Sequence, residues 1–151
     1  LKYIGNLLSI FGEYFSYQDS FLKDNIMPIQ ESGQLKFIEP GKSPFENIDL
    51  LFVDGHTEKQ MIPHIQYQDK TIVFMADLLP TVGHIPLPYV MGYDTRPLLT
   101  MDEKEKFLNK AADNKYLLFL EHDATNELCT VKLGEKGVRL DQTYKFNEVF
   151  N

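Results

Sequence analysis

Three side chains that can bind a metal ion, His56, Asp77 and His122, each follow a short apolar run of sequence. Each run is short enough to form a strand, and the runs cover residues 48–53, 71–76 and 116–120. In layered α/β proteins, ligands bind outside the carboxyl ends of the strands, so we expect the three side chains to converge. Two imidazole nitrogens and a carboxylate are suitable donors for zinc or a similar divalent ion, and one aspartate can bridge two ions.

The other two histidines are weaker candidates, because a single histidine is more often a surface or core residue than a ligand. His84 follows Asp77 by seven residues. It either hydrogen-bonds a substrate or a metal ligand or is simply a polar loop residue. His64 follows Pro63, and we expect it in a segment that joins two strands.

Asp54 and the aromatic residues of one loop complete the set of candidates. Asp54 precedes a Gly-His-Thr turn and either orients that turn or only helps to form it. Tyr89, Met91 and Tyr93 lie in a loop that contains Pro and Gly. These three side chains either line an apolar substrate pocket or cover the adjacent core.

The first 44 residues form a lead-in that contains one short helix and one strand. The helix opens near residues 17–20 and is expected to end at Pro28, because proline disfavours helix at the residue before it. Residues 34–38 are expected to form the strand, and residues 39–44 have the Pro and Gly content of a loop.

The second half of the chain contains a helix and a hairpin. The residues from Thr100 to Glu103 have the pattern of a capping box, which predicts a surface helix that continues to Ala112. Residues 130–133 and 138–140 are expected to pair across a Gly-bounded turn. The helix side chains expected to face the core are Phe107, Leu108 and Ala111.

Buried strands that alternate with surface helices indicate an α/β (α+β layered) domain, in which helices cover one face of a sheet. We treat residues 1–151 as a single domain, because this length is ordinary for one domain with its own core. Residues 1–44 are the lead-in, and residues 45–151 carry the candidate metal motifs.

The composition excludes several classes of protein. A formal net charge of -7 disfavours nucleic acid as a partner, and no apolar run approaches the roughly 18 residues needed to cross a membrane. The single cysteine, Cys129, cannot form an internal disulfide and is interpreted as a strand residue rather than a nucleophile. No signal peptide is visible, so we expect a cytoplasmic protein.

The residues named above resemble a known family. Residues 53–60, 72–77 and 119–123 are similar to the third, fourth and fifth metal-binding motifs of the metallo-β-lactamase fold, and the spacings of 21 and 45 residues between His56, Asp77 and His122 suit that fold. The resemblance implies that His56 binds a first metal ion, His122 binds a second, and Asp77 bridges them. The loop after Asp77 resembles the lactonase and organophosphate-hydrolase-like branch.

One family motif is absent. The family's first motif, His-x-His-x-Asp-His, supplies two ligands to each ion, yet no histidine precedes His56. The resemblance implies an αβ/βα sandwich of two similar halves, and this chain has strands for the second half only, with a mixed or antiparallel sheet. We therefore interpret the chain as a C-terminal fragment, or as a degenerate paralogue.

The resemblance implies a metal-dependent hydrolase that uses a metal-bound hydroxide, with zinc as the expected metal and iron or manganese as other suitable ions. Its substrates would be small esters, lactones or phosphoesters. With half of the ligands, the chain alone is expected to be inactive. The alternatives are a non-catalytic binding or self-assembling module and a redox protein that holds iron. The expected partners are the missing N-terminal half or a second copy at the uncovered sheet face.

Overall fold

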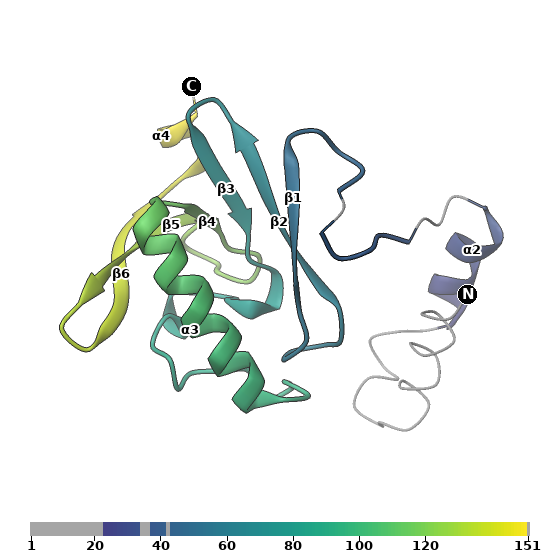
Figure 1. The fold of residues 1–151 in the computed structure, drawn as a ribbon, viewed down its shortest axis with the longest axis horizontal. Helices are drawn as coiled ribbons and strands as arrows, with labels where there is room; N and C mark the ends of the chain where they lie inside the picture. Colours follow the sequence, from purple (N-terminus) through teal and green to yellow (C-terminus); the bar gives the residue numbers. More distant parts are fainter. Residues whose placement is uncertain (1–22, 34–36, 42, 151) are drawn as a thin grey trace. The chain divides into compact units, whose positions relative to one another are not determined.

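The fold was taken from a computed structural model that describes residues 23–33, 37–41 and 43–150 (Figure 1). The described residues belong to two units, one that ends at Phe37 and one that begins at Ile38. Helix α2 (Lys23–Glu31) belongs to the first unit. The second unit contains every strand that the structure describes, and therefore all of the candidate metal-binding residues.

The prediction that Pro28 ends the first helix is wrong, because Pro28 lies inside α2. The fixed φ of proline is compatible with a helix, and the carbonyl of Pro28 still accepts a hydrogen bond from Ser32 N at 2.9 Å. The helix ends instead before Gly33, whose φ of +71° suits a helix terminus. The predicted start of this helix, at residues 17–20, lies outside the described residues.

The segment predicted as the first strand, residues 34–38, lies mostly outside the described residues. Phe37 and Ile38, which are described, have no strand structure. The loop prediction for the following residues is confirmed by a turn at Pro40 and Gly41, where Gly41 has a φ of +78°.

The second unit is built on one mixed six-stranded sheet whose strands follow the chain in order (Figure 1). Strands β3 and β4 are parallel, and all other neighbouring pairs are antiparallel. The mixed or antiparallel sheet expected from the sequence is therefore confirmed. The strands are β1 (Ile48–Val53), β2 (Gln60–Tyr67), β3 (Lys70–Phe74), β4 (Leu117–Phe119), β5 (Leu128–Gly134) and β6 (Gly137–Tyr144).

The segment around His64 is a strand, so the expectation that His64 lies in a connection is wrong. Pro63 obscured the strand, since proline cannot donate a hydrogen bond to a sheet. Pairing of β2 with β3 begins only after it, at His64, while Pro63 is opposite Leu50 of β1. Among the described strands, β1 pairs only with β2, so its residues alternate between exposed and partly buried rather than being buried throughout as the sequence predicts.

Helix α3 (Pro97–Asn114) connects β3 to β4 and lies across the sheet (Figure 1). It begins three residues before Thr100, because Pro97 occupies the first turn, where its missing N–H is not needed. The predicted capping box is therefore wrong, and Thr100 is buried inside the helix. The inward-facing residues are as predicted, namely Phe107, Leu108 and Ala111.

The sheet has an apolar cluster on each face, as the two-residue period of a strand requires. On the α3 side, Val73, Leu118 and Cys129 pack with the helix. Burial raises the pKa of the Cys129 thiol to about 12, so this cysteine is an inert strand residue, as predicted. On the other face, a smaller cluster that includes Leu117 packs with Phe150, at the end of the short helix α4 (Phe146–Val149).

The remaining elements are the expected hairpin and two short 3-10 helices. The β5–β6 hairpin turns through Gly137, which has a φ of +106°. The 3-10 helices η1 (Ala76–Leu78) and η2 (Val82–His84) lie between β3 and α3. No helix in the described part of the chain is both long enough and apolar enough to span a membrane.

The core on the α3 side can be tested by truncating Leu118, which is fully buried. We expect Leu118→Ala to lower the free energy of unfolding by about 2–5 kcal/mol, because it removes apolar contacts and leaves a cavity. Leu133→Ala, at an exposed leucine of the same sheet, is the matched control. Urea unfolding measures both, and equal losses would contradict the described core.

Candidate metal centre

The structure brings the three predicted residues together. His56 lies after β1, Asp77 lies in η1 after β3, and His122 lies after β4. The Nε2 atom of His56 is 3.4 Å from Oδ2 of Asp77, and the Nε2 atom of His122 is 3.1 Å from Oδ1 of the same aspartate. Each carboxylate oxygen of Asp77 therefore faces a different imidazole.

The parallel pairing of β3 and β4 explains why Asp77 and His122 meet. Parallel strands end at the same edge of a sheet, and Phe74 at the end of β3 is level with Phe119 at the end of β4. The backbone of His122 also donates a hydrogen bond to the carbonyl of Pro80 at 3.2 Å. The two loops that carry the side chains are thus joined directly.

His56 is oriented by Asp94, a residue that sequence reasoning missed. Its Nδ1 atom is 2.7 Å from Oδ1 of Asp94, whose side chain is only 1% exposed. A carboxylate can only accept a hydrogen bond, so Nδ1 must be the donor. The Nε2 atom then faces Asp77, and a cation between it and the carboxylate would have a donor on each side. Metal-binding histidines are commonly held by a carboxylate in this way.

The donor types fit a divalent cation. Oδ1 of Asp77 is buried, and no hydrogen-bond partner reaches it from the described part of the chain; its contact with His122 is close but does not have hydrogen-bond geometry. Because buried polar atoms are rarely left unpaired, this atom is suited to a ligand. No group of three or more such side chains arranged around a single ion occurs among the described residues.

The turn that carries His56 is fixed by helix α3. The carboxylate of Glu103 accepts hydrogen bonds from the backbone N–H of Asp54 at 2.8 Å and of Gly55 at 3.0 Å. The guanidinium of Arg96 donates to the carbonyl of Asp54 at 2.9 Å. The side chain of Asp54 itself accepts from the backbone N–H of Lys59 at 2.9 Å. Asp54 therefore closes the turn.

The turn that carries His122 is held by its neighbour Asp123. Its carboxylate accepts hydrogen bonds from the backbone N–H groups of Val82, Thr125 and Asn126 at 2.9–3.1 Å. Although burial raises the pKa of Asp123, these hydrogen bonds lower it to about 2. Asp123 is therefore an ionised anchor between the two loops.

The structure also describes the other predicted residues. Nδ1 of His84 is 2.9 Å from the hydroxyl of Thr81, and burial lowers the pKa of His84. Tyr89 and Tyr93 are 60% and 70% exposed, so their role at a substrate pocket stays a prediction. His64 is a buried core residue.

The contacts of His64 explain why it is a core residue. Its Nδ1 atom is 3.0 Å from the carbonyl oxygen of Ile62. Its ring also packs edge-on against Phe107 and Tyr116, and burial lowers its pKa.

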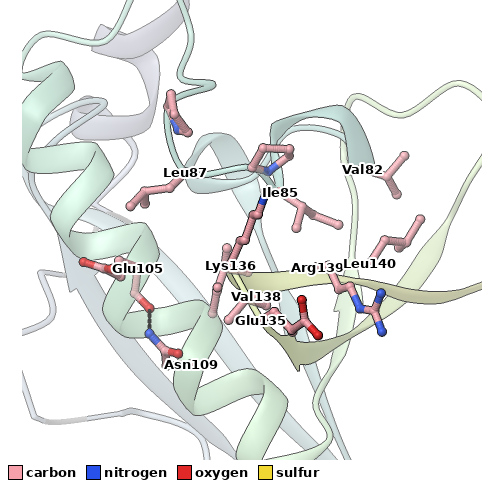
Figure 2. A pocket seen from close by; sticks show the side chains of 15 residues that line it. Val82, Ile85, Leu87, Glu105, Asn109, Glu135, Lys136, Val138, Arg139 and Leu140 are labelled. Carbon is pink, nitrogen blue, oxygen red and sulfur yellow. Dashed lines mark hydrogen bonds between the residues drawn. The ribbon is translucent and has the colours of Figure 1, made fainter.

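The structure also contains a cavity of about 830 Å³ (Figure 2). Its walls come from the loop after η2, from α3 and from the β5–β6 hairpin. Ile85 and Leu87 face Val138 across the cavity, and Lys136 extends into it. None of the three candidate metal ligands lines it.

Comparison with solved structures identifies the fold. No protein-family model matches the sequence, and no curated protein matches it. Among solved structures, the chain is similar to AidC, a dizinc quorum-quenching lactonase, with 18% identity and a TM-score of 0.71 over 91% of this chain and 48% of that one.

Two further structures are similar. One is a probable metal-dependent hydrolase from Staphylococcus aureus, with 26% identity and a TM-score of 0.64 over 76% of this chain and 42% of that one. The other is the hydrolase AbOPH of the β-lactamase superfamily, with 16% identity and a TM-score of 0.69 over 80% of this chain and 42% of that one.

The chain therefore has the fold of the C-terminal half of metallo-β-lactamase superfamily hydrolases. It spans less than half the length of each of these three structures. The resemblance found in the sequence is confirmed, and so is the fold class.

The close approach of Gly55 to α3 gives a test of the His56 turn. A Cβ atom at Gly55 would lie 2.5 Å from the backbone nitrogen of Thr100, so the turn or the helix must shift. We expect Gly55→Ala to lower the free energy of unfolding by about 1–3 kcal/mol and to displace the NMR signals of His56.

Gly92→Ala is the matched control, because a Cβ atom at Gly92 meets nothing within 4 Å. Chemical unfolding measures the stability of both variants, and NMR spectra record their histidine signals. A Gly55→Ala protein as stable as the Gly92→Ala protein, with unchanged His56 signals, would show that the turn does not pack against α3 in this way.

Proposed function

We propose that this chain is the C-terminal half of a metal-dependent hydrolase of the metallo-β-lactamase superfamily. The observation that carries the proposal is the convergence of His56 and His122 on opposite oxygens of Asp77. The three residues come from separate loops, and their types and chain order are those expected for half of a dinuclear site. The similar structures, which are a lactonase and two hydrolases, support the same interpretation.

In this proposal each residue has one role. His56 would hold one ion and His122 the other, each through Nε2, and Asp77 would supply one carboxylate oxygen to each. Asp94 would hold the ring of His56 so that Nε2 is available as a donor. Bound divalent ions would supply a water molecule activated near neutral pH and would polarise the substrate's carbonyl or phosphoryl oxygen.

Zinc is the proposed metal and a small ester, lactone or phosphoester the proposed substrate. The dizinc lactonase among the similar structures supports zinc and a lactone. Imidazole and carboxylate donors also suit iron and manganese, so these donor types do not distinguish zinc from the other two metals. His84, Tyr89 and Tyr93 are the residues proposed to contact the substrate or support the ligands.

The described residues offer each ion only two donors, one imidazole nitrogen and one oxygen of Asp77. Zinc sites normally have three or four protein ligands, so we propose that the remaining ligands come from an N-terminal half. The sheet face opposite α3 supports a partner there. Met61 and Tyr67 alternate along β2 with the core residues Ile62 and His64, and they remain 43% and 50% exposed.

The same exposed face supports a second candidate, a non-catalytic module that binds a partner or a second copy of itself. In that case the three residues keep their arrangement without chemistry. Oligomeric state alone does not separate the two candidates, because a separated half of an enzyme would expose the same face. The coding sequence before Leu1, together with metal content and activity of the gene's full product, does separate them.

Metal binding by this chain tests the roles of the ligands. We expect weak Zn²⁺ binding in calorimetry, with changes in the NMR signals of His56 and His122 but not of His64. Asp94→Asn should weaken binding by about 10–100-fold, as is typical when the residue that orients a ligand is lost. Asp77→Asn should weaken it at least as much.

Asp69→Asn is the matched control, since it makes the same change at an exposed carboxylate beside Lys70. It should leave Zn²⁺ affinity unchanged. If all three variants bind Zn²⁺ like the unmodified chain, the proposed ligand set is wrong.

The hydrolase role requires the missing ligands. We expect the coding sequence before Leu1 to contain an in-frame His-x-His-x-Asp-His motif, and the longer product with zinc to hydrolyse lactone, ester or phosphoester probes that this chain leaves intact. Removing zinc with a chelator should abolish turnover. If the natural chain begins at Leu1, the binding module replaces the hydrolase as the preferred function.

A further inference from the structure

We infer that Glu103 and Lys104, adjacent residues of α3, are positioning residues that assemble the His56–Asp94 pair. The inference rests on the proposed role of His56 as a metal ligand. His56 and Asp94 are 38 residues apart in the chain, so their contact depends on whatever holds their two segments in place. Each of the two helix residues holds one of those segments.

Glu103 holds the segment before His56. Both of its carboxylate oxygens are used, one by the N–H of Asp54 and the other by the N–H of Gly55. Hydrogen bonds to a charged acceptor are stronger than those between neutral groups. They also fix the direction of the backbone immediately before the histidine.

Lys104 holds the segment before Asp94. Its side chain is 1% exposed, and its ammonium donates to the carbonyl oxygens of His84 at 2.9 Å, Pro86 at 3.3 Å and Tyr89 at 2.5 Å. An ammonium has three N–H donors, so all of them are used. Apart from one short 3-10 helix, this segment has no regular structure of its own.

The burial of Lys104 has a cost that the contacts must offset. Removal from water lowers the pKa of Lys104 to about 8, while the negative charge of Asp94 opposes that change. An apolar side chain would avoid the desolvation cost, but it would leave three carbonyls without this donor. The charge thus stabilises one loop conformation rather than the core.

The two segments meet directly beside the pair. The backbone of Thr95 donates to the carbonyl of His56 at 3.1 Å, and the backbone of Arg96 donates to the carbonyl of Gly55 at 2.9 Å. Because Glu103 and Lys104 are neighbours on one rigid helix, the helix sets the spacing between the segments. A metal site needs that precision, since small displacements of a ligand reduce affinity.

The Nδ1–H proton of His56 reports on this pair in the metal-free protein. We expect NMR to show this proton protected from exchange with water, whether or not Nε2 is protonated, because Asp94 accepts its hydrogen bond. Lys104→Met and Glu103→Gln should each speed its exchange by about tenfold or more, which corresponds to a loss of about 1.4 kcal/mol in the stability of the pair.

Lys106→Met and Glu105→Gln are the matched controls, because they make the same changes at exposed positions of α3. They should leave the exchange rate unchanged. The His64 ring, which lies in β2, is an internal reference and should be unaffected in every variant. A general loss of stability would also speed exchange of the His64 ring proton, which bonds the carbonyl of Ile62, so it is distinguishable from a positioning effect.

If Lys104→Met does not fold, Lys104→Gln serves instead, because its amide keeps two N–H donors, and it should give a smaller acceleration. A folded Lys104 variant together with a folded Glu103→Gln variant, both with wild-type exchange at His56, would overturn the inference. Since no metal is present in this measurement, its failure would leave the Zn²⁺ titration as a separate test of the proposed function.

Discussion

The parallel pairing of β3 with β4 is the constraint on which the rest of this structure depends. Two parallel strands cannot be joined by a tight turn, so the chain must cross the sheet between them. Here the crossing consists of the loop after Asp77 and helix α3. The same pairing aligns Phe74 with Phe119 and so places the residues that follow both strands at one edge.

Helix α3 consequently has two functions in the fold. Its buried face, with Phe107 and Leu108, closes the core over the sheet, and apolar burial of this kind is the main source of stability. Its first turns contribute Glu103 and Lys104. The hydrogen bonds of Glu103 go to the turn after β1, and those of Lys104 go to the end of η2 and to the loop that follows it. The helix therefore links the rigid core to the loops that carry the candidate metal ligands.

The candidate centre contains buried polar groups that are costly to desolvate. Asp94 and Asp77 each have one buried carboxylate oxygen without a hydrogen-bond partner in the described part of the chain, and Lys104 is a buried cation. Such groups are costly in a protein interior. The unpaired oxygen of Asp77 is understandable if it serves a ligand, because it is then paired when the ligand is present.

The sequence was sufficient to predict the residues at the strand ends but not the residues that support them. His56, Asp77 and His122 follow apolar runs, and the edge of a sheet collects such positions. Asp94 has no comparable local pattern, since its contact with His56 exists only in three dimensions. Glu103 did have a pattern, that of a capping box. Because the helix begins earlier, at Pro97, the carboxylate of Glu103 does not cap the helix and binds the backbone of the His56 turn instead. Strand β2 was missed because Pro63 interrupts its sequence signal.

The small number of donors at the candidate centre and the exposed sheet face can be explained by the same missing partner. The centre provides two donors for each proposed ion, fewer than a zinc site normally has, and the sheet face opposite α3 leaves Met61 and Tyr67 exposed. A partner that supplied only ligands would leave the apolar face exposed, and a partner that only covered that face would leave the ions under-coordinated. An N-terminal half that packs on the sheet and brings histidines to its edge would correct both, which is why we prefer it to self-association.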